Sequence, residues 1–116
     1  MRAEELTKVV VAALEDMKAR DIRVIDVRGK TSVTDVMIIA SGTSNRHVKS
    51  QSEHVVEKAK QHGVQPLGIE GENEAEWILV DLGDVVVHIM QPEIRDFYHL
   101  EKLWTTEEVS SRERRK

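Results

Sequence analysis

Carboxylates are the first groups in this sequence whose spacing suggests chemistry. Asp81 and Asp84 stand three residues apart, and paired carboxylates hold the metal ions of phosphoryl-transfer enzymes. Asp84, however, follows Gly83 at a turn, whereas Asp81 projects from one face of the strand before it, and no third carboxylate converges on the pair. Asp84 is therefore expected to be a turn residue, and the pattern does not favour a metal site.

The five histidines are the next candidates for metal ligands or for proton transfer. His47 and His54 are seven residues apart on a predicted helix, which separates them by roughly 10.5 Å along the axis, too far for one ion. His88 stands alone on a predicted strand. Cysteine is absent, which removes thiolate sites and disulfides, and no nucleophile has a base at a recognisable spacing. We expect no catalytic residues, no metal and no cofactor.

The segment SGTSN, residues 41–45, could hold an anion on backbone amides, because it joins a predicted strand to a predicted helix. It lacks the lysine and the second glycine of a phosphate-binding loop. A capping turn with Ser44 as the helix N-cap is the stronger interpretation, and a weak anion site stays open as the alternative.

A β-hairpin, residues 77–90 (WILVDLGDVVVHIM), is the element around which the chain is organised. Gly83-Asp84 suits a two-residue turn, and pairing Leu82 with Val85 fixes the register, so that directly paired residues share a face. One face is then wholly aliphatic: Ile78, Val80, Leu82, Val85, Val87 and Ile89. The other mixes apolar and polar groups: Trp77, Leu79, Asp81, Val86, His88 and Met90.

The remaining elements follow from hydrophobic periodicity. We expect a helix over residues 3–20 with Lys18 and Arg20 in its last turn, a strand over 21–27, a central strand over 35–41, and a helix from Ser44 to Gly63. Residues 64–69 are expected to form an edge strand, because Pro66 cannot donate a ladder hydrogen bond. A short helix over 94–104 and a charged, disordered tail over 105–116 complete the chain.

These elements predict one domain, residues 1–104, of the α/β class: an α+β two-layer fold with a mixed five-stranded sheet. Two long helices cover one face, and only the short helix shields the other. Trp77, Leu79, His88 and Met90 on that less covered face form a candidate interface. On the short helix, Phe97, Leu100 and Trp104 form the apolar stripe, and the polar side extends the interface: Arg95, Tyr98 and Glu101.

Composition limits the class of partner. The formal charge is −4, which argues against a protein held on nucleic acid mainly by phosphate neutralisation and favours a basic protein partner. A contact with RNA through Lys49, Lys58, Lys60 and the tail is a lesser hypothesis. No apolar run approaches the roughly 20 residues of a membrane span and no signal-peptide pattern is present, so we expect a soluble, cytoplasmic protein without a membrane partner.

Three ordered segments resemble one known family. DVMIIASGTSNRH, EWILVDLGDVVVHIM and the arginine of RDFYHLEKLW are together similar to the Iojap or RsfS family, the bacterial ribosomal silencing factors, over about residues 9–104. The family signature falls here on Asp35, Gly42, Ser44, Arg46, His47, Trp77, Asp81, Val87, His88, Arg95, Tyr98, Leu100, Glu101 and Trp104. Val36-Met37 stands where the family often has an aromatic residue after the aspartate.

The resemblance implies a non-enzymatic regulator with a nucleotidyltransferase-like topology. Such a protein binds the large ribosomal subunit through its universal protein number fourteen, blocks association with the small subunit, represses translation when nutrients are scarce and acts in large-subunit biogenesis. The expected contact residues are Trp77, Leu79, Asp81, His88, Met90, Arg95, Tyr98 and Glu101. A homodimer through the same face, and a divergent nucleotidyltransferase using Ser44 and the aspartates, are the alternatives.

Overall fold

The computed structural model describes residues 1–30, 32 and 34–98. Its elements run in the predicted order of helix, two strands, helix, three strands and a short helix. They are α1 (Ala3–Asp16), β1 (Arg20–Asp26), β2 (Val36–Ser41), α2 (Asn45–Gln61), β3 (Gly68–Glu70), β4 (Trp77–Asp81), β5 (Val85–Met90) and α3 (Pro92–Tyr98). The predicted continuation of the last helix to residue 104 and the tail over 105–116 lie outside the described residues.

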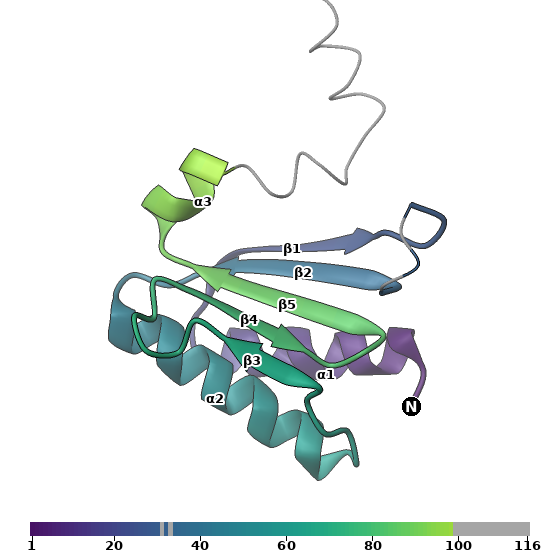
Figure 1. The fold of residues 1–116 in the computed structure, drawn as a ribbon. Coiled ribbons are helices and arrows are strands. Elements are labelled where there is room, and N and C mark those ends of the chain that lie inside the picture. The colour runs from purple at the N-terminus through teal and green to yellow at the C-terminus, as the bar shows by residue number, and fades with distance from the viewer. Residues whose placement is uncertain (31, 33, 99–116) are drawn as a thin grey trace, which may run out of the picture.

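The strands form one mixed five-stranded sheet in the order β1-β2-β5-β4-β3. Only β2 and β5 are parallel, and the other neighbours are antiparallel. Figure 1 shows α1 and α2 side by side beneath one face of the sheet and α3 beyond the opposite face, at the end of β5. The structure confirms the predicted α+β fold with two long helices on one face.

The hairpin has the predicted register. Trp77 pairs with Met90, Leu79 with His88 and Asp81 with Val86, and Gly83 has a φ of +91°, which glycine adopts at little cost. All six residues of the predicted aliphatic face lie in the main core, between the sheet and the helices α1 and α2. The period of two therefore placed every hairpin side chain on its correct face.

The prediction that residues 35–41 form the central strand is wrong, because β5 occupies the middle of the sheet and β2 lies next to it. Every residue of β2 and of β5 is buried. A continuous apolar run indicates a strand with neighbours on both edges and cover on both faces. It does not tell which of two such strands lies in the middle of the sheet.

The first helix ends at Asp16, four residues earlier than predicted, so Lys18 and Arg20 lie beyond it. Lys18 adopts a left-handed φ of +59°, and the amide of Ala19 donates to the Leu14 carbonyl oxygen at 3.0 Å. This six-to-one bond closes a helix end and reverses the chain, which lets β1 begin at Arg20. Apolar spacing to Met17 does not reveal that reversal.

The edge strand is confirmed at the sheet boundary but is shorter than predicted, because β3 begins at Gly68 and Pro66 precedes it.

The second long helix begins as predicted. The Ser44 hydroxyl accepts a hydrogen bond from the amide of His47 at 3.1 Å, and Gly63, just past the helix, has a φ of +84°.

Candidate protein-interaction face

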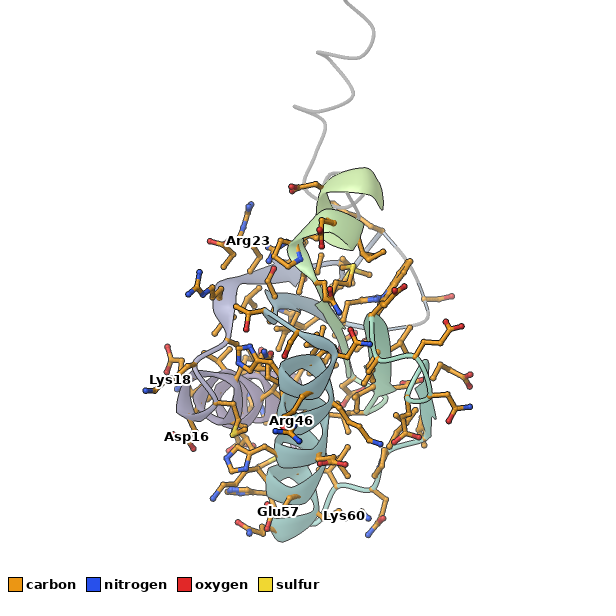
Figure 2. All side chains as sticks on the ribbon, turned by 90° about the vertical axis from the view of Figure 1, so that its left-hand side faces the viewer. Asp16, Lys18, Arg23, Arg46, Glu57 and Lys60 are labelled. Carbon is orange, nitrogen blue, oxygen red and sulfur yellow. The ribbon has the colours of Figure 1, made fainter. Side chains whose placement is uncertain are left out.

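The open face is the face of the sheet opposite α1 and α2. One row of paired residues crosses it from edge to edge: Glu70, Leu79, His88, Ile39 and Arg23. The row begins with a carboxylate on β3, passes through apolar groups and His88, and ends with a guanidinium on β1. In Figure 2, Arg23 lies on the β1 side of the sheet, on the same side as α3. The face therefore has an acidic edge and a basic edge.

Trp77 and His88 form the central contact of the open face. The indole Nε1 of Trp77 donates a hydrogen bond to Nδ1 of His88 at 2.9 Å, and the ring centroids are 5.9 Å apart. Because Nδ1 accepts, the imidazole proton is assigned to Nε2. Burial lowers the pKa of His88 from 6.5 to about 4, so the imidazole is neutral at pH 7 and holds the half-buried indole in one orientation.

A second, smaller core lies on the open face beside α3. Its buried members are Ile25, Val27, Met37, Ile39 and Met90, and Trp77 and Ile94 pack against them. Met90, a predicted contact residue, has no exposed surface. Its side chain belongs to the cluster against which the Trp77 indole packs.

Arg95 is also buried, with 7% of its surface exposed, although the sequence placed it on the polar side of the short helix. Its Nη1 donates to the Ser41 hydroxyl at 2.8 Å. The reason is that α3 begins directly after β5, and the amide of Arg95 bonds the Gln91 carbonyl oxygen at 3.0 Å. This tight entry turns Arg95 back toward the end of β2, where it fixes α3 to the sheet.

Asp81 and Leu79 are both half-buried on β4. The Oδ1 atom of Asp81 accepts a hydrogen bond from the amide of Gly83 at 2.9 Å, so this carboxylate braces the hairpin turn. Asp84 lies in the turn, as predicted, and its carbonyl oxygen accepts bonds from the amides of Asp35 and Val36. The sequence did not reveal the bracing role of Asp81.

The loop over residues 71–76 forms an acidic rim beside Trp77. A pocket beside this rim is lined by Gly71, Glu74, Glu76, Trp77 and Ile94. The Asn45 side chain donates to the Glu74 carbonyl oxygen at 2.9 Å, and the amide of Gln91 donates to the Glu76 carbonyl oxygen at 3.0 Å. The sequence signal for this acidic rim is a glutamate at every second position from 70 to 76, directly before Trp77.

The strand-to-helix junction after β2 is a capped turn in which several amides already have hydrogen-bond partners. Ser44 caps the amide of His47, and the amide of Thr43 donates to Nδ1 of His47 at 2.9 Å. The Nε2 atom of His47 lies 2.7 Å from the Met17 carbonyl oxygen and donates to it. His47 thus joins the ends of α1 and α2, and the capping interpretation accounts for this segment better than an anion site does.

Tyr98 and Glu101 are the remaining predicted contact residues. Tyr98 is the last residue of α3, and Glu101 lies outside the described residues, as do Leu100 and Trp104.

Across residues 1–30, 32 and 34–98, no group of three histidine or acidic side chains is arranged to hold a metal ion. In that same part of the chain no helix is long and apolar enough to cross a membrane.

Comparison with known proteins identifies close relatives. A family model described as "Ribosomal silencing factor during starvation" matches residues 1–116. A "Ribosomal silencing factor RsfS" of Chromobacterium violaceum is 47% identical over 104 residues, which cover 90% of this chain and 85% of that protein. A Mus musculus protein named "Mitochondrial assembly of ribosomal large subunit protein 1" is 40% identical over 100 residues, covering 84% of this chain and 44% of that protein.

Solved structures agree with these sequence relationships. A crystal structure of a Chromobacterium violaceum protein superposes with a TM-score of 0.89 at 46% identity, covering 92% of this chain and 89% of that one. A second, from Bacillus halodurans, gives a TM-score of 0.80 at 35% identity and covers 87% and 94% of the two chains. The family resemblance of the three ordered segments is thereby confirmed, and the chain belongs to the ribosomal silencing factor family, RsfS.

Proposed function

We propose that this protein is a non-enzymatic ribosomal silencing factor that binds the large ribosomal subunit through its open face. The principal partner is the universal protein number fourteen of that subunit, and the bulk of the bound domain prevents the small subunit from joining. Membership of the RsfS family supports the ribosomal role. The observation that carries the site is Trp77, half-buried and fixed by His88 on the face that α1 and α2 leave uncovered.

Trp77 suits the role of an anchor for a physical reason. Tryptophan contributes strongly to binding when a partner desolvates it, and a side chain held in one orientation before binding loses little conformational entropy on binding. His88 supplies that restraint at one end of the indole, and Met90 and Ile94 pack in the same cluster. In this proposal Trp77, Leu79 and Asp81 face the partner, together with Tyr98 and Glu101, whereas the buried residues His88, Met90 and Arg95 shape the surface.

The charges near Trp77 favour a basic partner. Glu70, Glu72, Glu74 and Glu76 are all exposed, and two of them border the pocket beside the indole. Proteins that sit on ribosomal RNA need basic surfaces to neutralise phosphates. An acidic rim around an aromatic anchor complements such a surface and disfavours direct contact with RNA at the same place.

The silencing activity lowers translation by reducing the number of joined ribosomes when nutrients are scarce. The name of the mouse relative refers to assembly of the large subunit, which supports a further role in large-subunit biogenesis.

A homodimer through the open face would hide Trp77, so dimer and ribosome would compete. The alternative function is that of a divergent nucleotidyltransferase using Ser44 and the aspartates. The Ser44 hydroxyl and the Asp81 carboxylate each accept a hydrogen bond from a backbone amide, and no observation favours this enzyme.

Co-sedimentation with purified large subunits tests the proposal. Trp77→Ala should weaken binding by about 30-fold or more, the equivalent of roughly 2 kcal/mol for a buried aromatic anchor. Leu67→Ala is the matched control, because Leu67 is 74% exposed and follows α2 instead of lying on the open face. Circular dichroism checks that both variants are folded. Equal binding by Trp77→Ala and the wild type would refute the anchor, and binding to small subunits alone would refute the silencing role.

A further inference from the structure

A second groove lies at the β3 edge of the molecule, on the helix side of the sheet. It runs between α2 and β3 and is lined by Ser52, Glu53, Val56, Glu57, Lys60, Gln61, Ile69 and Glu72. Val56 and Ile69 are half-buried at its base and pack against the main core. Figure 2 shows Glu57 and Lys60 on the part of α2 that is farthest from α3. None of the lining residues belongs to the Trp77 pocket.

The strand that borders this groove, β3, is an edge strand. Across residues 1–30, 32 and 34–98, β3 is the last strand in the sheet order and pairs only with β4. The backbone groups on its other side are a template for one more strand. Ile69 pairs with Val80, a core residue on the helix side, so an added strand would direct alternate side chains over Val56 and Ile69.

The charge of the groove limits the kind of chain segment that can bind there. Glu53, Glu57 and Glu72 are exposed along it, and among the described residues that line it Lys60 is the one basic side chain. A second copy of this chain would bring two sets of glutamates together, and a nucleic acid would bring phosphates to them, so both are disfavoured. Successive side chains of a strand point to opposite faces, so a segment meets the apolar base and the acidic rim at once only if its groove-facing positions, every second residue, include both apolar residues and lysine or arginine.

We propose that the α2–β3 groove is a second docking site, which takes an extended basic peptide segment as a sixth strand on the free edge of β3. Backbone hydrogen bonds along β3 supply register, and the glutamates of α2 supply selectivity for basic side chains, which is the general mode of strand addition. The groove shares no lining residue with the Trp77 pocket, so a segment bound along β3 leaves the indole accessible to its own partner.

The test uses the full chain labelled with ¹⁵N and a blocked heptapeptide, the lysine-valine peptide, in which lysine and valine alternate at the odd positions and serine fills the even ones, so that lysine and valine share one face of the strand. Amide shifts should move saturably at Ile69, Glu70 and Val56 and stay unchanged at Trp77. A glutamate-valine heptapeptide should not bind. A lysine-valine peptide methylated on alternate backbone nitrogens should bind at least about ten-fold more weakly, since it cannot complete the ladder. Equal affinity of the methylated peptide, or shifts centred on Trp77, would overturn the proposal.

Charge reversal supplies the matched variants. Glu53→Lys should weaken the lysine-valine peptide by about five-fold, a magnitude set by the loss of one exposed attraction and the gain of one repulsion. Glu15→Lys makes the same change in net charge on the exposed surface of α1 and should leave the affinity within two-fold. Trp77→Ala should bind the peptide as the wild type does, whatever it does to ribosome binding. Equal weakening by the Glu53 and Glu15 variants, or a concentration-dependent dimer through β3 that the peptide fails to displace, would refute the site.

Discussion

The buried imidazole of His88 makes the stability of this protein depend on pH in a predictable direction. Burial lowers the pKa of His88 from 6.5 to about 4. Between these two values the unfolded chain binds a proton at His88 that the native chain does not, so lowering the pH favours the unfolded state. Stability is therefore retained above pH 6.5 and lost as the pH falls from 6.5 toward 4.

The shift sets the size of the effect. Linkage gives about 1.4 kcal/mol per pH unit in the middle of this range, and about 3 kcal/mol in all between pH 7 and pH 4. His88→Gln removes the ionisable group and keeps an oxygen that can accept from the Trp77 indole. The variant should lose less stability than the wild type on acidification, and the difference between them should widen by about 3 kcal/mol over the same interval.

Urea denaturation followed by circular dichroism at pH 7, 6, 5 and 4 measures this difference. His62→Gln is the control, because His62 is exposed just beyond α2, and it should follow the wild-type curve. Parallel curves for the wild type and His88→Gln would refute the reasoning, since they would mean that His88 binds protons equally in both states. Proton NMR of the His88 ring in the native protein checks the low pKa directly.

Three further changes test the structure that supports the open face. Gly71→Ala should destabilise the protein by about 2 kcal/mol or more in urea denaturation, because Gly71 has a φ of +87° and an added Cβ would lie 2.1 Å from the Trp77 carbonyl oxygen; a loss under 0.5 kcal/mol would show that the loop adapts. Ser44→Ala should cost about 1 kcal/mol by removing the cap of α2, whereas Ser44→Asp should keep most of it. Arg95→Ala should cost more than Arg28→Ala, because Arg95 is buried on Ser41 while Arg28 pairs with Asp26 and Glu4 in solvent; equal melting temperatures for the two variants would contradict this.

The hairpin shows what sequence periodicity can predict. Its alternation of apolar and polar residues, with a glycine in the turn, defines both the register and the two faces, and the structure agrees at every pair. The helix cap at Ser44 was predictable for a similar reason, because the side chain that caps a helix is local in sequence. Features set by neighbouring residues can be derived without knowledge of the rest of the fold.

Features set by distant contacts were not predictable. Met90 lies on the correct face, but its complete burial depends on how Ile25, Ile39 and Ile94 surround it. The position of β5 in the middle of the sheet depends on a crossover between strands that apolar runs do not encode. The pocket beside Trp77 depends on Asn45 drawing the acidic loop toward α2.

Subunit joining, followed by light scattering, is the measurement that tests the central claim most directly. Purified small and large subunits are mixed after the large subunits have been incubated with the wild type or with Trp77→Ala. The wild type should reduce the amplitude of the joining signal in proportion to the large subunits it occupies, and Trp77→Ala should leave that signal nearly intact at the same concentration. A wild type that co-sediments with large subunits and still permits full joining would contradict the claim that the bound domain keeps the small subunit away.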